Sequence, residues 1–252
     1  MKESKFGNIT FDSPEEKSAR AQFAKHFEQC PIPKDEVLSN LGLFLNSKSL
    51  SRILFMDHLY RQIIDVQGVV FEFGTRLGQN LALFSALRGI YEPFNRHRKI
   101  VGFDTFQGFP SISAKDGKST LMKKGTDSVS DNYVDYLTRL MEYQEMDNPL
   151  AHIKKFDVIA GDAVVEIDKY LKAHPETIVA LAYFDFDIYE PTKKCLEAIR
   201  PCLVKGSVLA FDELNDPDSP GETLALKEVL GLNNIKLKRY RYTSRVSYFV
   251  LE

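Results

Sequence analysis

The stretch Val69-Val70-Phe71-Glu72-Phe73-Gly74, followed by a second glycine at Gly78, decides the fold class of this chain. Five strand-forming residues lead into a glycine turn, and residues 79–88 then repeat their apolar side chains at helical spacing. The same order recurs, with further strands predicted at 99–103, 153–160, 178–184 and 207–211 and further helices at 163–172, 190–203 and 222–230. Repeated strand–helix units predict a doubly wound α/β fold, with a mostly parallel sheet and helices on both faces.

Three regions depart from this alternation. The last two strand-like runs, 235–242 and 245–251, follow each other without a helix, which predicts a terminal antiparallel pair. Residues 1–66 are predicted to form an N-terminal helical extension to a main domain of residues 67–252. The polar stretch 111–150 is predicted to be a lid inserted beside the ligand edge, with a solvated loop and a surface helix as the alternative.

Composition narrows the classes of function. The chain has 252 residues, with 33 Lys and Arg against 35 Asp and Glu, so its formal net charge is -2. This balance argues against a nucleic-acid partner bound by bulk positive charge. The longest apolar run, 178–184, is too short to span a bilayer, and the charged first residues do not form a signal peptide. Cys30, Cys195 and Cys202 do not form a disulfide framework, so we expect a soluble cytoplasmic protein without a membrane partner.

Acidic residues follow almost every predicted strand. In chain order they are Glu72, Asp104, Asp162, Asp185, Asp187, Asp212 and Glu213. Ligands of open α/β sheets bind at the carboxyl ends of the strands, so these side chains are expected to face one site. Clustered carboxylates repel one another unless a cation, a proton or a ligand hydroxyl lies among them. This edge of the sheet is therefore predicted to bind a metal, a ligand rich in hydroxyls, or both.

The first two strand ends indicate a nucleoside ligand. The turn between Gly74 and Gly78 lets the backbone approach a ligand at the start of a helix, although a plain tight turn has the same pattern. Asp104, at the end of the next strand, is placed to hold two ribose hydroxyls. The turn lacks the full G-x-G-x-x-G pattern, and the chain lacks the G-x-x-x-x-G-K-[ST] loop of nucleoside triphosphate sites.

The later strand ends indicate a metal. Asp185 and the pair Asp212-Glu213 are predicted to lie at neighbouring strand ends, where three carboxylates make an oxygen-rich site for a hard cation such as Mg2+. A helix N-cap or a salt bridge is the alternative for Asp185 or Asp187 taken alone.

Four stretches together resemble the macrocin/TylF-type O-methyltransferases, S-adenosylmethionine-dependent enzymes that methylate sugar hydroxyls in natural-product and glycan pathways. Residues 70–78 are similar to the E-x-G-x-x-x-G loop of the family, and residues 102–110 to its D-S-F-x-G-L-P segment. Residues 185–192 are similar to D-x-D-x-Y-x-x-T, and residues 211–213 to V-D-D with Glu in the last place. The resemblance covers roughly residues 66–230 and reaches neither the N-terminal region nor the lid.

The resemblance implies a Rossmann-like methyltransferase sheet that binds S-adenosylmethionine. It assigns to the cofactor Glu72, Gly74, Thr75, Gly78, Asp104, Thr105, Asp162 and Asp185. It also makes Asp185, Asp212 and Glu213 the ligands of Mg2+ or another divalent cation, and Asp187 the general base. The longer side chain of Glu213, in place of the family's Asp, is expected to shift the metal.

The implied function is metal-dependent methylation of a hydroxyl on a small-molecule sugar acceptor. A divalent cation lowers the pKa of an acceptor hydroxyl, and a carboxylate within reach can then remove its proton. Two alternatives stay open: a catechol or phenol acceptor, and a nucleotide-binding protein that transfers no methyl group. The resemblance further implies a homo-oligomer.

Overall fold

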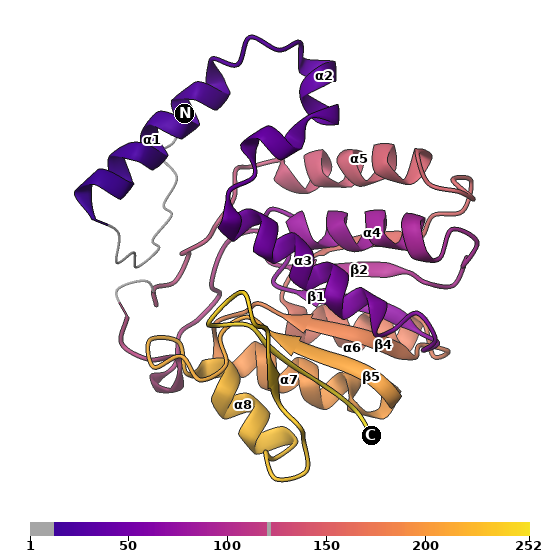
Figure 1. The fold of residues 1–252 in the computed structure, drawn as a ribbon. Helices are drawn as coiled ribbons and strands as arrows, with labels where there is room; N and C mark the ends of the chain where they lie inside the picture. The colour runs from indigo at the N-terminus through magenta and orange to yellow at the C-terminus, as the bar shows by residue number, and fades with distance from the viewer. Residues whose placement is uncertain (1–12, 120–121) are drawn as a thin grey trace.

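The structure, a computed structural model, describes residues 13–119 and 122–252 (Figure 1). Its strands are β1 (Val69–Phe73), β2 (Ile100–Asp104), β3 (Phe156–Ala160), β4 (Val179–Phe184), β5 (Leu203–Phe211), β6 (Lys238–Arg239) and β7 (Ser247–Val250). Within the described residues they form a seven-stranded sheet in the order β3-β2-β1-β4-β5-β7-β6. β1 to β5 run parallel, and β7 is antiparallel to both β5 and β6. The predicted fold class and the terminal antiparallel pair are confirmed.

Helices cover both faces of this sheet (Figure 1). They are α1 (Pro14–Glu28), α2 (Lys34–Ser39), α3 (Ser47–Arg61), α4 (Gln79–Tyr91), α5 (Tyr133–Met146), α6 (Ala163–Ala173), α7 (Tyr189–Ile199) and α8 (Gly221–Val229), with 3-10 turns η1 (Leu41–Phe44), η2 (Ala114–Asp116) and η3 (Arg200–Cys202). Apolar side chains of α3, α4 and α5 share one core with the sheet, and those of α6, α7 and α8 share the other. Since both faces are covered, every residue of the central strand β4 is buried.

The register brings the strand ends together. Phe184, the last residue of β4, lies opposite Phe73 of β1 on one side and Phe211 of β5 on the other. The strand order reverses between the neighbours β1 and β4, since β2 and β3 extend the sheet on one side of β1 and β4 and β5 on the other, and α/β sheets open a crevice for ligands at such a point. The residues that follow Phe73, Phe184 and Phe211 therefore meet at one edge.

The described part of residues 1–66 is helical, but its elements differ in how they pack. α1, α2 and η1 contain no buried residue, and Figure 1 shows α1 and α2 away from the sheet. α3 instead buries Phe55, Met56, Leu59 and Tyr60 in the core shared with the sheet. The boundary at residue 66 stays a prediction, and α3 packs as part of the sheet domain.

A buried arginine anchors the C-terminal end of α3. The guanidinium of Arg98 donates to the carbonyl oxygens of Ile63, Val66 and Gly68 at 2.8, 2.7 and 2.5 Å, and it pairs with Glu92 at 2.8 Å. Because the guanidinium group is buried and the carbonyls are at least partly buried, the arginine satisfies acceptors that have little access to water. The connection from α3 to β1 is fixed to the sheet by these bonds.

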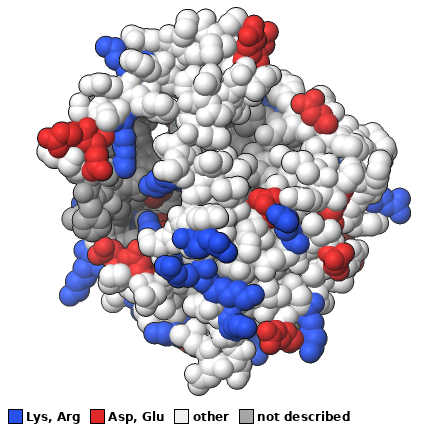
Figure 2. Space-filling view, viewed as in Figure 1, with Lys and Arg blue, Asp and Glu red and all other residues white. Residues whose placement is uncertain are grey.

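Some boundaries differ from the predictions. The helix predicted at 190–203 ends at Ile199, because Pro201 cannot donate the next helical hydrogen bond, and β5 already starts at Leu203. The predicted strand at 235–242 shortens to Lys238–Arg239 at the sheet edge. Figure 2 shows Lys and Arg gathered on the lower middle of this face. The edge strand consists of the exposed Lys238 and Arg239, and exposed Lys236 and Arg241 lie on either side of it in the chain. Charged side chains discourage the unpaired edge from adding another strand.

Among the described residues, no helix combines the length and the apolar character needed to cross a bilayer.

Candidate functional site

A cavity of about 590 Å³ opens at the carboxyl ends of β1, β2, β4 and β5. Most of the predicted site residues line it: Gly74, Thr75, Asp104, Thr105, Asp162, Asp185, Asp187, Asp212 and Glu213. Glu72 lies buried on β1 behind the cavity, and Gly78 precedes α4 as its N-cap. The strand ends predicted from the sequence thus meet around one space large enough for a small-molecule ligand.

The turn after β1 requires its glycines. Gly74 has φ +94°, and a Cβ atom there would lie 2.0 Å from the carbonyl oxygen of Asp185. Gly78 has φ +79°, and its Cβ would lie 2.4 Å from the side chain of Leu137 on α5. Only glycine combines this conformation with such close packing, so the turn brings bare backbone to the cavity.

Buried polar atoms without partners surround that turn. Glu72 Oε2, Thr75 Oγ1 and Asn80 Oδ1 have no hydrogen-bond partner among the described residues. Burial raises the pKa of Glu72 to about 8, although Asn80, Thr75 and Arg52 oppose this effect. Buried polar groups are nearly always satisfied in the working state of a protein, so these atoms fit a ligand that carries N–H or O–H groups.

Asp104 organises the cavity wall between β1 and β2. Its Oδ2 accepts from the backbone N–H of Arg76 at 2.8 Å, and its Oδ1 accepts from that of Phe106 at 2.5 Å. Burial raises the pKa of Asp104, and these two hydrogen bonds oppose the rise. Each carboxylate oxygen has a second lone pair, so hydroxyl donors from a ligand remain compatible with both bonds.

Asp162 and Thr105 also lie at the cavity, each held by a local hydrogen bond. Asp162 is the N-cap of α6 and accepts from the backbone N–H of Val164 at 3.0 Å. Thr105 Oγ1 donates to the carbonyl oxygen of Gly108 at 2.8 Å. Both side chains therefore shape the loops that line the cavity.

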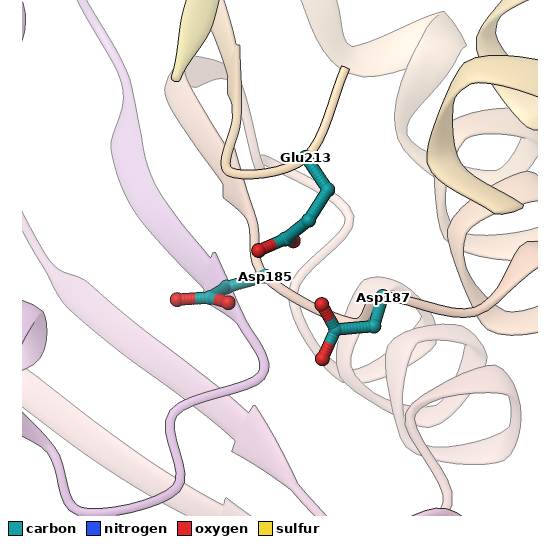
Figure 3. Close-up of side chains that lie close together, drawn as sticks. All are labelled: Asp185, Asp187 and Glu213. Atoms are coloured by element: carbon teal, nitrogen blue, oxygen red, sulfur yellow. The ribbon is translucent and has the colours of Figure 1, made fainter. Parts of the chain in front are cut away.

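Three carboxylates converge at the ends of β4 and β5. Asp185, Asp187 and Glu213 each offer one oxygen within 4.8 Å of the other two (Figure 3). Glu213 Oε2 is buried and has no partner among the described residues. Burial, reinforced by the neighbouring carboxylates, raises the pKa of Asp185 and of Glu213. An orphaned oxygen beside two others is a donor set that fits a hard divalent cation.

Two arginines reach these carboxylates from distant parts of the chain. Arg52 of α3 pairs with Asp212, lies 3.5 Å from Asp185 Oδ2, and donates to the Tyr183 hydroxyl at 2.6 Å. Burial would raise the pKa of Asp212, but Arg52 and its hydrogen bonds hold it below the usual value. Arg245, just before β7, contacts Glu213 Oε1 at 2.5 Å. Asp212 is therefore engaged by Arg52, and the three converging acids include Asp187 in its place.

Glu222 connects the loop after β4, which carries Asp187, to the loop after β5, which carries Glu213. It is fully buried at the start of α8; its Oε1 accepts from the backbone N–H of Phe186 at 3.0 Å and of Asp187 at 3.4 Å, and its Oε2 from that of Glu213 at 3.2 Å. Burial raises the pKa of Glu222 to about 8. A Cβ atom on Gly221 would lie 2.6 Å from the backbone nitrogen of Tyr189, so the missing side chain lets α8 approach this closely.

Sequence reasoning missed Arg52, Arg245 and Glu222. Glu222 stands in the first turn of a predicted helix. An acid there is common because it interacts with the helix dipole, so its position alone gave only a weak indication of a role in the site. Arg52 and Arg245 had none, since they come from segments without a matched motif and reach the site only through packing.

The region predicted as a lid touches the site at several points. Its Ser119, Met122 and Asp127 line the cavity. Asp127 pairs with Arg76 of the glycine turn at 3.0 Å. Asp116 is buried and accepts from the backbone N–H of Tyr189 at 2.6 Å. The insertion is thus bonded both to the turn after β1 and to the start of α7.

Comparison with solved structures decides the family. A structure of CalS11, a calicheamicin methyltransferase, is 42% identical in sequence, covers 97% of this chain and 97% of its own, and superposes with a TM-score of 0.93. The chain belongs to the macrocin/TylF-type O-methyltransferases. An apo structure of CalS11, a TDP-rhamnose 3'-O-methyltransferase, is 41% identical over 96% of both chains with a TM-score of 0.84.

More distant structures support the fold of this macrocin/TylF-type enzyme. The O-methyltransferase NovP is 17% identical over 80% of this chain and 79% of its own, with a TM-score of 0.58. A scan against protein-family models found no match, and a search of curated proteins found none either.

Membership settles the enzyme class. This macrocin/TylF-type protein is an S-adenosylmethionine-dependent O-methyltransferase, which sets aside the alternative of a nucleotide-binding protein without methyl transfer. The glycine turn, and the atoms of Glu72, Thr75 and Asn80 that lack a partner in the described part of the chain, fit a cofactor with amino and hydroxyl groups. The individual residue roles within this methyltransferase stay predictions.

Proposed function

We propose that this methyltransferase moves a methyl group from S-adenosylmethionine to a hydroxyl of a sugar, with a divalent cation and with Asp187 as the general base. The observation that carries the proposal is the meeting of the glycine turn and the convergent acids Asp185, Asp187 and Glu213 around one cavity. Cofactor loop and acid cluster are thereby close enough to serve one transfer reaction.

The sugar acceptor is inferred from similarity. CalS11, at 41% identity over nearly the whole chain, acts on TDP-rhamnose, which favours a nucleotide-linked deoxysugar over the catechol alternative. No observation on this cavity specifically favours a phenol, so the sugar is the acceptor we propose.

In the cofactor part, Asp104 would hold the ribose hydroxyls, and Glu72 and Thr75 would face the donor groups of the amino acid end. Gly74 presents backbone without a side chain, so the cofactor can lie against the end of β1. The methyl sulfonium needs no activation, and the residues contribute by placing it in line with the acceptor oxygen. Asp162 and Thr105 complete the wall of the cavity.

In the acceptor part, Asp185 and Glu213 of the converging acids would hold the divalent cation, together with Asp212 once its pairing with Arg52 is released. When bound, it would supply positive charge that lowers the pKa of an acceptor hydroxyl. Asp187 would accept the proton. Burial raises the pKa of Asp187, which makes its carboxylate a stronger base than an exposed aspartate.

The region 111–150 is proposed as the lid of this cavity. Support comes from Ser119, Met122 and Asp127, which line the cavity, and from the ion pair between Asp127 and Arg76. A closed cover would exclude water from the transfer.

The test combines binding with turnover. Calorimetric titration with S-adenosylmethionine should show binding, and incubation with S-adenosylmethionine, TDP-rhamnose and Mg2+ should yield a sugar product heavier by one methylene. A chelator should stop this reaction. Binding without any methylated sugar across a panel of nucleotide sugars would overturn the acceptor, and full turnover in chelator would overturn the metal.

A further inference from the structure

Each of the three predicted metal ligands contacts an arginine. Arg52 pairs with Asp212 and lies 3.5 Å from Asp185, and Arg245 lies 2.5 Å from Glu213. The two arginines come from opposite ends of the chain, Arg52 from α3 and Arg245 from the segment before β7. They meet at the acidic centre only because α3 and the antiparallel edge pack on the same part of the sheet.

Charge explains why two arginines are found here. Several carboxylates with little solvent contact repel one another and need positive charge nearby. Two guanidinium groups carry the same total charge as one divalent cation. Guanidinium groups stay protonated in proteins, so Arg52 and Arg245 supply this charge at any working pH.

The arginines contact carboxylate groups that a metal ion would also use. Asp212 Oδ1 accepts from both Arg52 and the Tyr183 hydroxyl, and Glu213 Oε1 faces Arg245. A cation such as Mg2+ binds carboxylate oxygens at about 2.1 Å, too close for a guanidinium to share the same lone pair. A cation bound through Asp212 Oδ1 and Glu213 Oε1 would loosen both contacts, and one bound through the unpartnered Glu213 Oε2 would still be repelled by the guanidinium groups beside it.

We propose that Arg52 and Arg245 are internal counter-ions of the acidic centre, which a divalent cation displaces from Asp212 and Glu213. This inference rests on the proposed metal-dependent function. If the arginines compete with the metal for these carboxylates, their removal strengthens metal binding. If they instead held the metal ligands in place, their removal would weaken it.

The experiment titrates Mn2+, followed by electron paramagnetic resonance, into the wild type, Arg52→Met and Arg245→Met. Arg52→Met removes the contacts to Asp212 and Asp185, and Arg245→Met removes the contact to Glu213, so in each variant the dissociation constant should fall by about tenfold or more. Lys48→Met is the matched control, because Lys48 lies one helical turn before Arg52 and lines the same cavity without a contact to these acids among the described residues. Its affinity should change by less than about twofold, since an exposed charge is screened by water.

The outcomes separate the inference from the proposed function. Tighter binding in the two arginine variants but not in Lys48→Met supports displacement. Unchanged or weaker binding in both, with a wild type that binds Mn2+, overturns the inference and leaves the metal in place. Equal tightening in all three variants also overturns it, because overall charge would then suffice. Absence of Mn2+ binding in every protein overturns both the inference and the metal. If Arg52→Met does not fold, the more exposed Arg245 decides the test.

Discussion

The side chain of Glu222 holds the backbone N–H of Glu213 at 3.2 Å, and through its other oxygen it holds the loop that carries Asp187. A single carboxylate on α8 therefore links the loops that follow β4 and β5. Asp187 has φ +60°, a conformation that costs energy for a residue with a side chain and that these bonds help to maintain.

The first prediction concerns Glu222→Gln. The glutamine would place an NH2 group where one carboxylate oxygen now accepts from backbone N–H groups. Two donors would then face each other, so the loops that carry Asp187 and Glu213 should separate. We expect divalent-cation affinity and kcat to fall by about 10- to 100-fold, as for residues that support metal ligands, while S-adenosylmethionine binding stays unchanged. Calorimetry with Mn2+ and with the cofactor separates the two effects. Glu190→Gln, an exposed acid on α7, is the control; equal losses in both variants would argue against a specific role.

The second prediction concerns the proposed base. Asp187→Asn keeps the shape of the side chain but cannot accept the proton, so turnover should fall by about 10²- to 10⁴-fold. Cofactor binding should remain, because the change lies on the acceptor side of the cavity. Single-turnover methyl transfer measures the loss, and an undiminished rate would remove Asp187 as the base.

The third prediction concerns the metal. Asp185→Ala removes a carboxylate from the convergent acids, so the part of the activity that depends on a divalent cation should disappear. Activity measured over a Mg2+ series, with and without chelator, tests this. A variant that still responds to Mg2+ like the wild type would exclude Asp185 as a ligand.

The fourth prediction concerns stability and pH. Burial raises the pKa of Glu72 from 4.5 to about 8, so the folded protein holds a proton that the unfolded chain releases. The stabilising contribution is complete below pH 4.5 and is lost as the pH rises through about 8. In Glu72→Gln this loss is absent, so the Tm of the variant should fall less than that of the wild type as the pH rises toward about 8. Each kcal/mol of unfolding free energy corresponds to about 2–4 °C in Tm. Parallel Tm curves for the two proteins would contradict the prediction.

The fifth prediction concerns the glycine turn. Gly74→Ala places a methyl group 2.0 Å from the Asp185 carbonyl oxygen at a positive φ, so the turn must shift. We expect a loss of stability of at least about 1 kcal/mol and much weaker cofactor binding. Gly231→Ala, also at positive φ but with open space around its Cβ, is the control for strain alone. If both variants lose the same stability and both retain the cofactor, close packing at Gly74 is not the cause.

Much of the site was predictable because it consists of strand ends. A polar residue directly after a buried strand marks a carboxyl end, and a parallel sheet places such ends at one edge, so Asp104, Asp185 and Asp212 could be grouped without coordinates. The same argument fails for Arg52 and Glu222. Their side chains enter the site from helices, and the packing that brings them there leaves no periodic signal in the sequence. The strand predicted at 235–242 was too long for a related reason. A strand pattern in the sequence does not show over how many residues the neighbouring strand pairs with it.

The anchor at Arg98 has a consequence for sequence changes in the first helices of the chain. It ties the connection that follows α3 to the sheet through three carbonyl groups, whereas α1, α2 and η1 bury no residue. The helix that carries Arg52 is therefore held in place by contacts that follow it in the chain, and not by the segment that precedes Asn46. Sequence changes within residues 14–45 should therefore leave the strand ends and their side chains in place.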